Sequence, residues 1–138
     1  MLPVMVNGVG IDCINRVAIV SHVPATVILS VMKVEGGKNG DAVRNKNGTF
    51  DYGVFQINSI WLPIIARYGY TRDDVQFNAC KNAEVAAWIL SQCIANGKSI
   101  WSGVGDYHSH TPSHNQKYSS GVRSYYQKLD SVITSLSA

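Results

Sequence analysis

The chain has 138 residues, 46% hydrophobic and 15% charged, a composition typical of one globular domain that buries its core without metal or many crosslinks. The net charge of +3 comes from scattered Lys and Arg residues that are not interleaved with aromatic residues, so we expect no nucleic-acid partner. No apolar stretch approaches the roughly 18–20 residues of a membrane span, and segment 1–8 lacks the basic start and full apolar region of a signal peptide, which we expect to be absent or incomplete in this chain.

The N-terminal part predicts two helices. We expect the first helix from Asp12 to about Ser21, with Val17 and Val20 on its apolar side. Pro24 suits the first turn of a second helix, which ends at the glycine pair of residues 36–37.

Glu35 ends this second helix and is its most informative residue. Val27, Ile28 and Val31 precede it by eight, seven and four residues, spacings close to whole helical turns, so Glu35 continues the core-facing stripe. Burial penalises the ionised carboxylate and raises its pKa, which keeps the group protonated nearer neutral pH. A general acid needs that state. The alternative is a surface glutamate at a frayed helix end.

A β-hairpin is expected next. Asn47-Gly48 is a strong turn signal between residues 43–46 and 49–52, so the small β region lies around residues 43–57. Asp51 lies on this hairpin and offers a second carboxyl group in a different environment. Cleavage of glycosidic bonds uses such a pair, one protonated and one ionised. Two acids sixteen residues apart are common, however, and their spacing alone does not establish this chemistry.

The rest of the chain predicts helices. We expect them from about residue 59 to 68, from a cap at Asn82 to about residue 97, and around residues 100–107. The last segment has apolar residues at intervals of three and four, which predicts a core-facing helix and a packing role for Tyr125. These apolar residues are Tyr118, Val122, Tyr125, Leu129, Val132 and Leu136. The predicted fold class is α+β, mainly α, in a single domain over residues 1–138.

The three cysteines leave one unpaired if a disulfide forms. A bridge between Cys13 and Cys80 would tie the first helix to the body of the fold. Cys93 lies on an apolar helix face, and we interpret it as a buried thiol rather than a ligand. Three reduced cysteines in a cytosolic protein remain the alternative.

The histidines at 108, 110 and 114 lack a specific metal-ligand spacing, so we expect no metal site. The glycines form no phosphate-binding fingerprint, and we expect no cofactor.

Residues 44–59 resemble the hairpin of animal-type lysozymes and, more closely overall, of lysozyme-like lytic transglycosylases (the SLT-domain family) that serve bacterial secretion and pilus systems. The resemblance covers about residues 12–129, the expected core of the domain. The motifs that carry it are Glu35 at a helix end, Gly53-Val54-Phe55-Gln56-Ile57, Cys80-Lys81-Asn82 with Ala86-Ala87, Tyr107-His108, and Tyr118 to Tyr126.

The resemblance implies a lysozyme-like fold and a role for each matching residue. Glu35 is similar to the family's catalytic acid/base, and Gln56 and Asn58 to groups near its sugar subsites. Tyr107 is similar to the tyrosine that supports the glutamate. The family's cysteines favour the Cys13–Cys80 bridge. Two departures affect the cleft: Gly36 stands where the family usually has serine, and Tyr107-His108-Ser109-His110 replaces Tyr-Asn-Ala-Gly.

The resemblance implies cleavage of peptidoglycan glycan strands with formation of 1,6-anhydro-muramoyl ends. Two alternatives remain: a hydrolytic muramidase that uses Glu35 and Asp51, and an inactive glycan-binding or assembly module. A cytosolic scaffold would require reduced cysteines. We expect an exported, periplasmic monomer that opens the cell wall for a secretion, conjugation or pilus machine, with components of that machine as partners.

Overall fold

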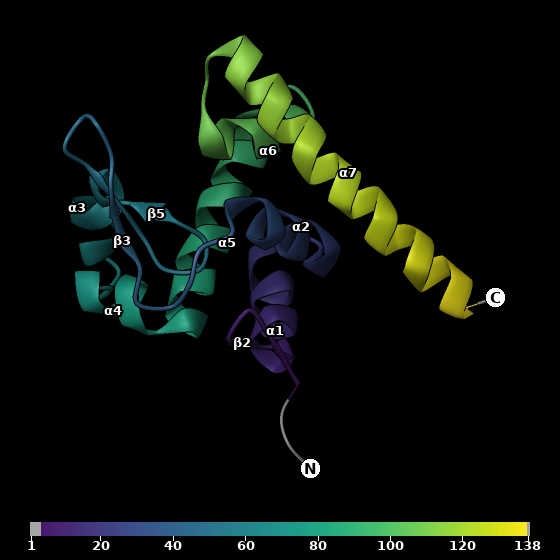
Figure 1. Ribbon diagram of the computed structural model, residues 1–138, viewed down its shortest axis with the longest axis horizontal. Coiled ribbons are helices and arrows are strands. Elements are labelled where there is room, and N and C mark those ends of the chain that lie inside the picture. Colours follow the sequence, from purple (N-terminus) through teal and green to yellow (C-terminus); the bar gives the residue numbers. More distant parts are fainter. Residues whose placement is uncertain (1–3, 138) are drawn as a thin grey trace.

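The computed structural model describes residues 4–137. Helix α5 (Ala79–Asn96) runs through the middle of the molecule, with the small sheet and two short helices on one side and the other long helices on the other (Figure 1). The remaining helices are α1 (Ile11–Ser21), α2 (Ala25–Glu35), the 3-10 helix η1 (Ser59–Trp61), α3 (Leu62–Ala66), α4 (Arg72–Phe77), α6 (Ile100–His108) and α7 (Pro112–Ser137). The strands are β1 (Met5–Val6), β2 (Val9–Gly10), β3 (Ala42–Arg44), β4 (Phe50–Tyr52) and β5 (Ile57–Asn58).

The predicted hairpin is present and is extended by a third strand. The antiparallel order is β3-β4-β5, and Asp51 on β4 pairs with Val43 on one side and Asn58 on the other. Strands β1 and β2 form a separate two-stranded ribbon. The predicted fold class, mainly helical with a small β region, is confirmed.

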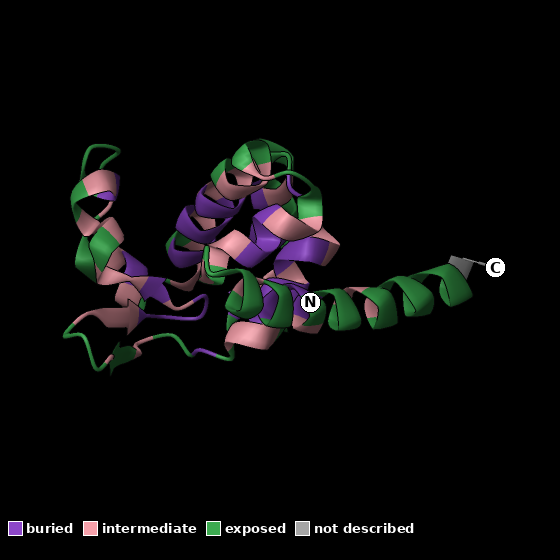
Figure 2. Ribbon diagram, turned by 90° about the horizontal axis from the view of Figure 1, so that it is seen from above, coloured by how far each residue is buried: buried purple, intermediate pink, exposed green. Residues whose placement is uncertain are grey.

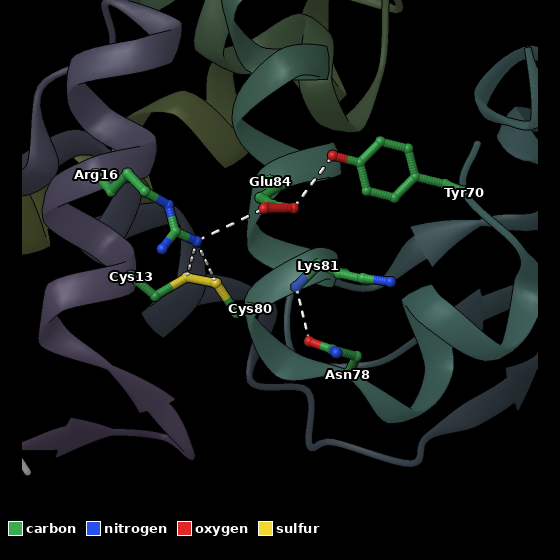
Figure 3. The surroundings of a disulfide bond; sticks show 7 residues. All are labelled: Cys13, Arg16, Tyr70, Asn78, Cys80, Lys81 and Glu84. Carbon is green, nitrogen blue, oxygen red and sulfur yellow. Dashed lines mark hydrogen bonds and ion pairs between the residues drawn. A yellow bond between two sulfur atoms is a disulfide. The ribbon is translucent and has the colours of Figure 1, made fainter. Parts of the chain in front are cut away.

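The core is one cluster of buried apolar side chains to which α1, α2 and α5 all contribute. Val27, Ile28 and Val31 are all buried, as the stripe leading to Glu35 predicts. A disulfide joins Cys13 on α1 to Cys80 near the start of α5 (Figure 3). Among the described residues, no single helix is long and apolar enough to cross a membrane. Only α1 and α2 taken together have the length and apolar composition of a membrane span, and the pair is bent by 117° at the break between them.

The cap of α5 was predicted at the wrong asparagine. Asn78, not Asn82, is the N-cap, and its side chain accepts a hydrogen bond from the Lys81 N–H. Asn82 is fully buried one turn into the helix. The first helix also differs in one position, because Val20 is 75% exposed.

Only the first half of α7 faces the core. Tyr118 and Val122 are buried, whereas Val132 is 56% and Leu136 82% exposed. Figure 2 shows the C-terminal half of α7 extending beyond the body of the molecule and exposed along most of its length. The core-facing prediction is therefore wrong for the second half of α7 and for Tyr125, which is exposed, because α7 is longer than the surface on which it packs.

Candidate active site

Glu35 is the last residue of α2, and its position is set by how that helix ends. Gly36 closes the helix in the left-handed conformation (φ 65°), and its N–H donates to the Met32 carbonyl at 3.1 Å. Glycine adopts this conformation without the strain that a Cβ introduces. The residue that stands where the family usually has serine therefore serves as a helix C-cap.

Gly37 then brings the helix end against the β4–β5 turn. A Cβ at this position would overlap the Gly53 carbonyl oxygen and would lie 2.7 Å from the Gln56 side-chain nitrogen. Only glycine fits such an approach. The backbone that follows Glu35 is thus packed directly on the hairpin that carries Asp51.

The Glu35 carboxyl group is half-buried and has one short polar contact. The Tyr118 hydroxyl donates to its Oε2 atom at 2.5 Å. Burial, the largest effect, raises the pKa of Glu35 to about 7; the Tyr118 hydrogen bond opposes this rise and the nearby charge of Asp51 adds to it. A carboxyl group in this setting exchanges its proton near neutral pH.

Tyr107, predicted to support the glutamate, is stacked on Tyr118 with ring centroids 6.4 Å apart. Tyr107 donates to the Phe55 carbonyl at 2.7 Å, and the hydroxyl that reaches Glu35 belongs to Tyr118. Burial and the charge of Glu35 raise the pKa of both tyrosines, so both stay neutral donors. The His108 ring is stacked on Tyr118, with centroids 4.9 Å apart and planes 6° apart.

Asp51 and Asn58 form a linked polar pair on neighbouring strands. The Asn58 amide donates to Asp51 Oδ1 at 3.0 Å and to the Thr49 hydroxyl at 3.1 Å. The Asn58 side-chain oxygen accepts from the Ile60 N–H and caps η1. Asn58 therefore orients the Asp51 carboxyl group and fixes the end of the sheet.

Gln56 lies in the turn between β4 and β5 with a positive φ of 53°, which is uncommon for a residue other than glycine. Its side chain donates to the Gly53 carbonyl at 2.8 Å. Strained backbone of this kind persists where the surroundings hold it, often at functional sites.

These elements enclose a cleft of about 390 Å³. Every site residue predicted from the sequence lines it: Glu35, Asp51, Gln56, Asn58, Tyr107 and His108. Sequence reasoning missed several lining residues that carry polar or aromatic groups: Asn47, Thr49, Trp61 and Asp106. It also interpreted Tyr118 only as part of an apolar helix face.

Within residues 4–137, no group of three or more His, Cys, Asp or Glu side chains is arranged to hold a metal ion. His110 lies 3.3 Å from Asp106 at the rim of the cleft. Cys93 is a partly buried free thiol, and burial raises its pKa. The cleft thus combines a carboxyl group that titrates near pH 7 with a second carboxyl group across the hairpin, an arrangement that can give a proton to a bound ligand and take one back.

Residues 12–135 match the profile of the transglycosylase SLT domain. The chain is 27% identical over 107 residues to Protein IpgF of Shigella flexneri, an alignment that covers 77% of this chain and 70% of that protein. It is 26% identical over 133 residues to a peptidoglycan-binding-like protein of Escherichia coli O157:H7, and this alignment covers 87% of this chain and 79% of that protein. It is 23% identical over 129 residues to Invasion protein IagB of Salmonella typhimurium, and this alignment covers 90% of this chain and 81% of that protein.

Proposed function

Because the chain belongs to the transglycosylase SLT domain family, we propose that it is a peptidoglycan lytic transglycosylase. Its substrate is the β-1,4 bond between N-acetylmuramic acid and N-acetylglucosamine, and its product carries a 1,6-anhydro-muramoyl end. The observation that supports this most strongly is Glu35, half-buried in the cleft with its pKa raised to about 7.

Glu35 serves first as acid and then as base. Its carboxyl proton passes to the glycosidic oxygen as the bond to the muramoyl C1 breaks, and the N-acetylglucosamine side leaves as an alcohol. The Glu35 carboxylate then removes the proton from the 6-hydroxyl of the same muramoyl residue. That oxygen attacks C1 and closes the anhydro ring, so the acid is restored and no water is consumed. A pKa near the working pH suits both steps.

The neighbouring groups have supporting roles. Tyr118 donates to the ionised form of Glu35 and stabilises it between the two steps. The charge of Asp51, oriented by Asn58, favours the protonated acid before the reaction and stabilises positive charge at C1 during it. Gln56, Asn58, Tyr107 and His108 contact the sugars.

A hydrolytic muramidase is the second candidate, because Asp51 lines the same cleft as Glu35. In that reaction Asp51 acts as nucleophile or stabilises the cation, and water completes the cleavage. The two candidates differ in their products: the hydrolase releases reducing ends, and the transglycosylase releases anhydro ends.

We place the protein in the periplasm as a monomer that opens the cell wall locally for a secretion, conjugation or pilus apparatus. The disulfide supports an oxidising compartment, since such bonds persist there. One relative is named an invasion protein, which is consistent with a role beside such an apparatus.

Mass spectrometry of the products from purified peptidoglycan tests the proposal. Wild-type protein should release anhydro-muramoyl products, and Glu35→Gln should lower their rate by about a thousandfold while remaining folded. Asp51→Asn should slow the reaction without changing the product. Reducing ends from wild type, lost in Asp51→Asn, would establish the hydrolase instead. No product from folded wild-type protein would favour the inactive binding module.

A further inference from the structure

A second cavity, larger than the cleft, lies between α1, the α3–α4 segment and α5 and has a volume of about 590 Å³. None of its lining residues lines the cleft of Glu35. Its size falls in the range of about 300–1,000 Å³ typical of sites for small ligands. The reaction derived above does not use it.

Aromatic rings form much of its wall. Trp88 on α5 lies with its ring centroid 5.7 Å from that of Tyr68, and Tyr68 is 65% exposed. Trp88 also packs edge-on against Trp61, with ring centroids 6.0 Å apart. Because Trp61 lines the cleft and Trp88 the second cavity, this tryptophan pair lies between the two. Aromatic residues with an exposed ring face bind flat, partly apolar ligands.

The rim of the cavity adds polar groups whose hydrogen-bonding capacity is only partly used (Figure 3). Arg16 Nη2 forms an ion pair with Glu84 Oε1 at 3.6 Å, longer than a hydrogen bond, and donates to the Cys80 sulfur, a weak acceptor, at 3.0 Å. The Tyr70 hydroxyl donates to the other Glu84 oxygen at 3.1 Å. A donor and an acceptor therefore stand side by side next to the aromatic wall.

We propose that this cavity is a second glycan-binding site that takes one hexosamine unit of a peptidoglycan strand. The apolar face of a pyranose ring packs on Tyr68 and Trp88, and its hydroxyl or acetamido groups bond to Arg16 and Glu84. A purely apolar peptide side chain would use the aromatic wall but not the remaining donors of Arg16 and the remaining acceptor sites of Glu84, which favours the sugar. The choice of peptidoglycan rests on the proposed function of the cleft.

Two sites on one small protein change how it binds a polymer. A strand or a neighbouring strand held at the second cavity raises the effective concentration of glycan at the cleft. Cross-linked peptidoglycan should then bind more tightly than a short oligosaccharide that occupies the cleft alone.

Binding of a β-1,4-linked N-acetylglucosamine tetramer, followed residue by residue by NMR, tests this inference. We expect two groups of shifted signals, one around Glu35 and Asn58 and one around Tyr68 and Arg16. Tyr68→Ala should weaken binding at the second group by about tenfold and leave the first group unchanged. Tyr125→Ala, which removes a partly exposed tyrosine from α7, is the matched control and should change neither.

The outcomes separate this inference from the function of the cleft. Shifts around Glu35 alone would overturn the second site and keep the glycan cleft. Shifts around Tyr68 alone would support the second site and count against the cleft. No shifts would contradict both. A response around Tyr68 to an apolar phenylalanine-containing peptide but not to the tetramer would overturn the sugar assignment in favour of a protein segment.

Discussion

Glu35 holds its proton through effects of opposite sign. Burial and the charge of Asp51 favour the neutral acid, and the Tyr118 hydroxyl favours the carboxylate. With burial alone the group would stay protonated to a higher pH and release its proton less readily, and with the hydrogen bond alone it would be mostly ionised at neutral pH and have no proton to give. Their balance near neutral pH is what a residue needs when it must release and recover one proton in the same reaction.

Removing one atom, the Tyr118 hydroxyl oxygen, should change the pKa of Glu35. Tyr118→Phe removes the hydrogen bond that stabilises the ionised form, so the pKa of Glu35 should rise above its value of about 7. Carbon-13 NMR of the glutamate carboxyl groups measures this directly. Tyr125→Phe, on the same helix and away from the cleft, should leave the titration unchanged. A Glu35 pKa that falls or stays constant in Tyr118→Phe would show that the bond does not act in this way.

At the residue scale, the sequence predicts the inward position of Glu35 but not its contact with Tyr118. The helical spacing of Val27, Ile28 and Val31 predicts that the carboxyl group faces inward, because that inference is local. Tyr118 lies 83 positions from Glu35. The helical period of Tyr118 predicts which helix face it occupies, but not which polar group its hydroxyl contacts across the fold. The resemblance implies Tyr107, not Tyr118, as the tyrosine that supports Glu35.

At the scale of elements, the turn from Gly53 to Gln56 is held from two sides. The buried Asn82 side chain accepts from the Phe55 N–H at 2.9 Å and donates to the carbonyl oxygens of Tyr52 at 2.9 Å and Val75 at 2.7 Å. Tyr107 donates to the Phe55 carbonyl from α6. One asparagine thus joins the sheet, α4 and α5 at the point where Gly37 packs on the turn.

Replacing this asparagine should therefore be far more damaging than replacing the helix cap four residues earlier. Asn82→Ala leaves three buried backbone groups unpaired and should lower the free energy of unfolding by about 3 kcal/mol or more. Asn78→Ala removes only a capping bond and should cost about 1 kcal/mol. Urea denaturation of both variants measures the difference. Equal losses would mean that Asn82 does not organise the turn.

Other elements show why the sequence predicts some structures and not others. Long periodic helices and the Asn47-Gly48 turn have local signals and were predicted. The two-residue strand β5 and the six-residue helix α4 are too short to establish a period. The second half of α7 has the right period, yet Leu136 is exposed, because spacing specifies an apolar face and not what covers it.

At the scale of the whole molecule, α5 separates the hairpin side from the remaining helices and is tied to α1 by one covalent bond (Figure 1). Cys13 and Cys80 lie 67 positions apart, so the bond closes a long loop in the unfolded chain. That loop includes α2 with Glu35 and the whole sheet. The disulfide therefore restricts the unfolded state of the part of the chain that builds one side of the cleft.

Removing this bond should destabilise the fold without altering the cleft chemistry. The double substitution Cys13→Ser and Cys80→Ser should lower the free energy of unfolding by about 4 kcal/mol, the loss expected for a loop of this length. Cys93→Ser, a control at the free thiol, should change it by about 1 kcal/mol. Thermal or urea unfolding gives the values. A double variant as stable as wild type would show that the bond contributes little.

The pH dependence of anhydro-muramoyl product formation tests most directly that Glu35 is the acid of a peptidoglycan-cleaving site. Since the first step needs the protonated form, kcat/KM should fall as the pH rises through about 7, the pKa of Glu35. Glu35→Gln should be about a thousandfold slower than wild type at every pH in the range. A wild-type profile that stays flat through pH 7, or a Glu35→Gln variant with a rate close to that of wild type, would contradict the role of Glu35.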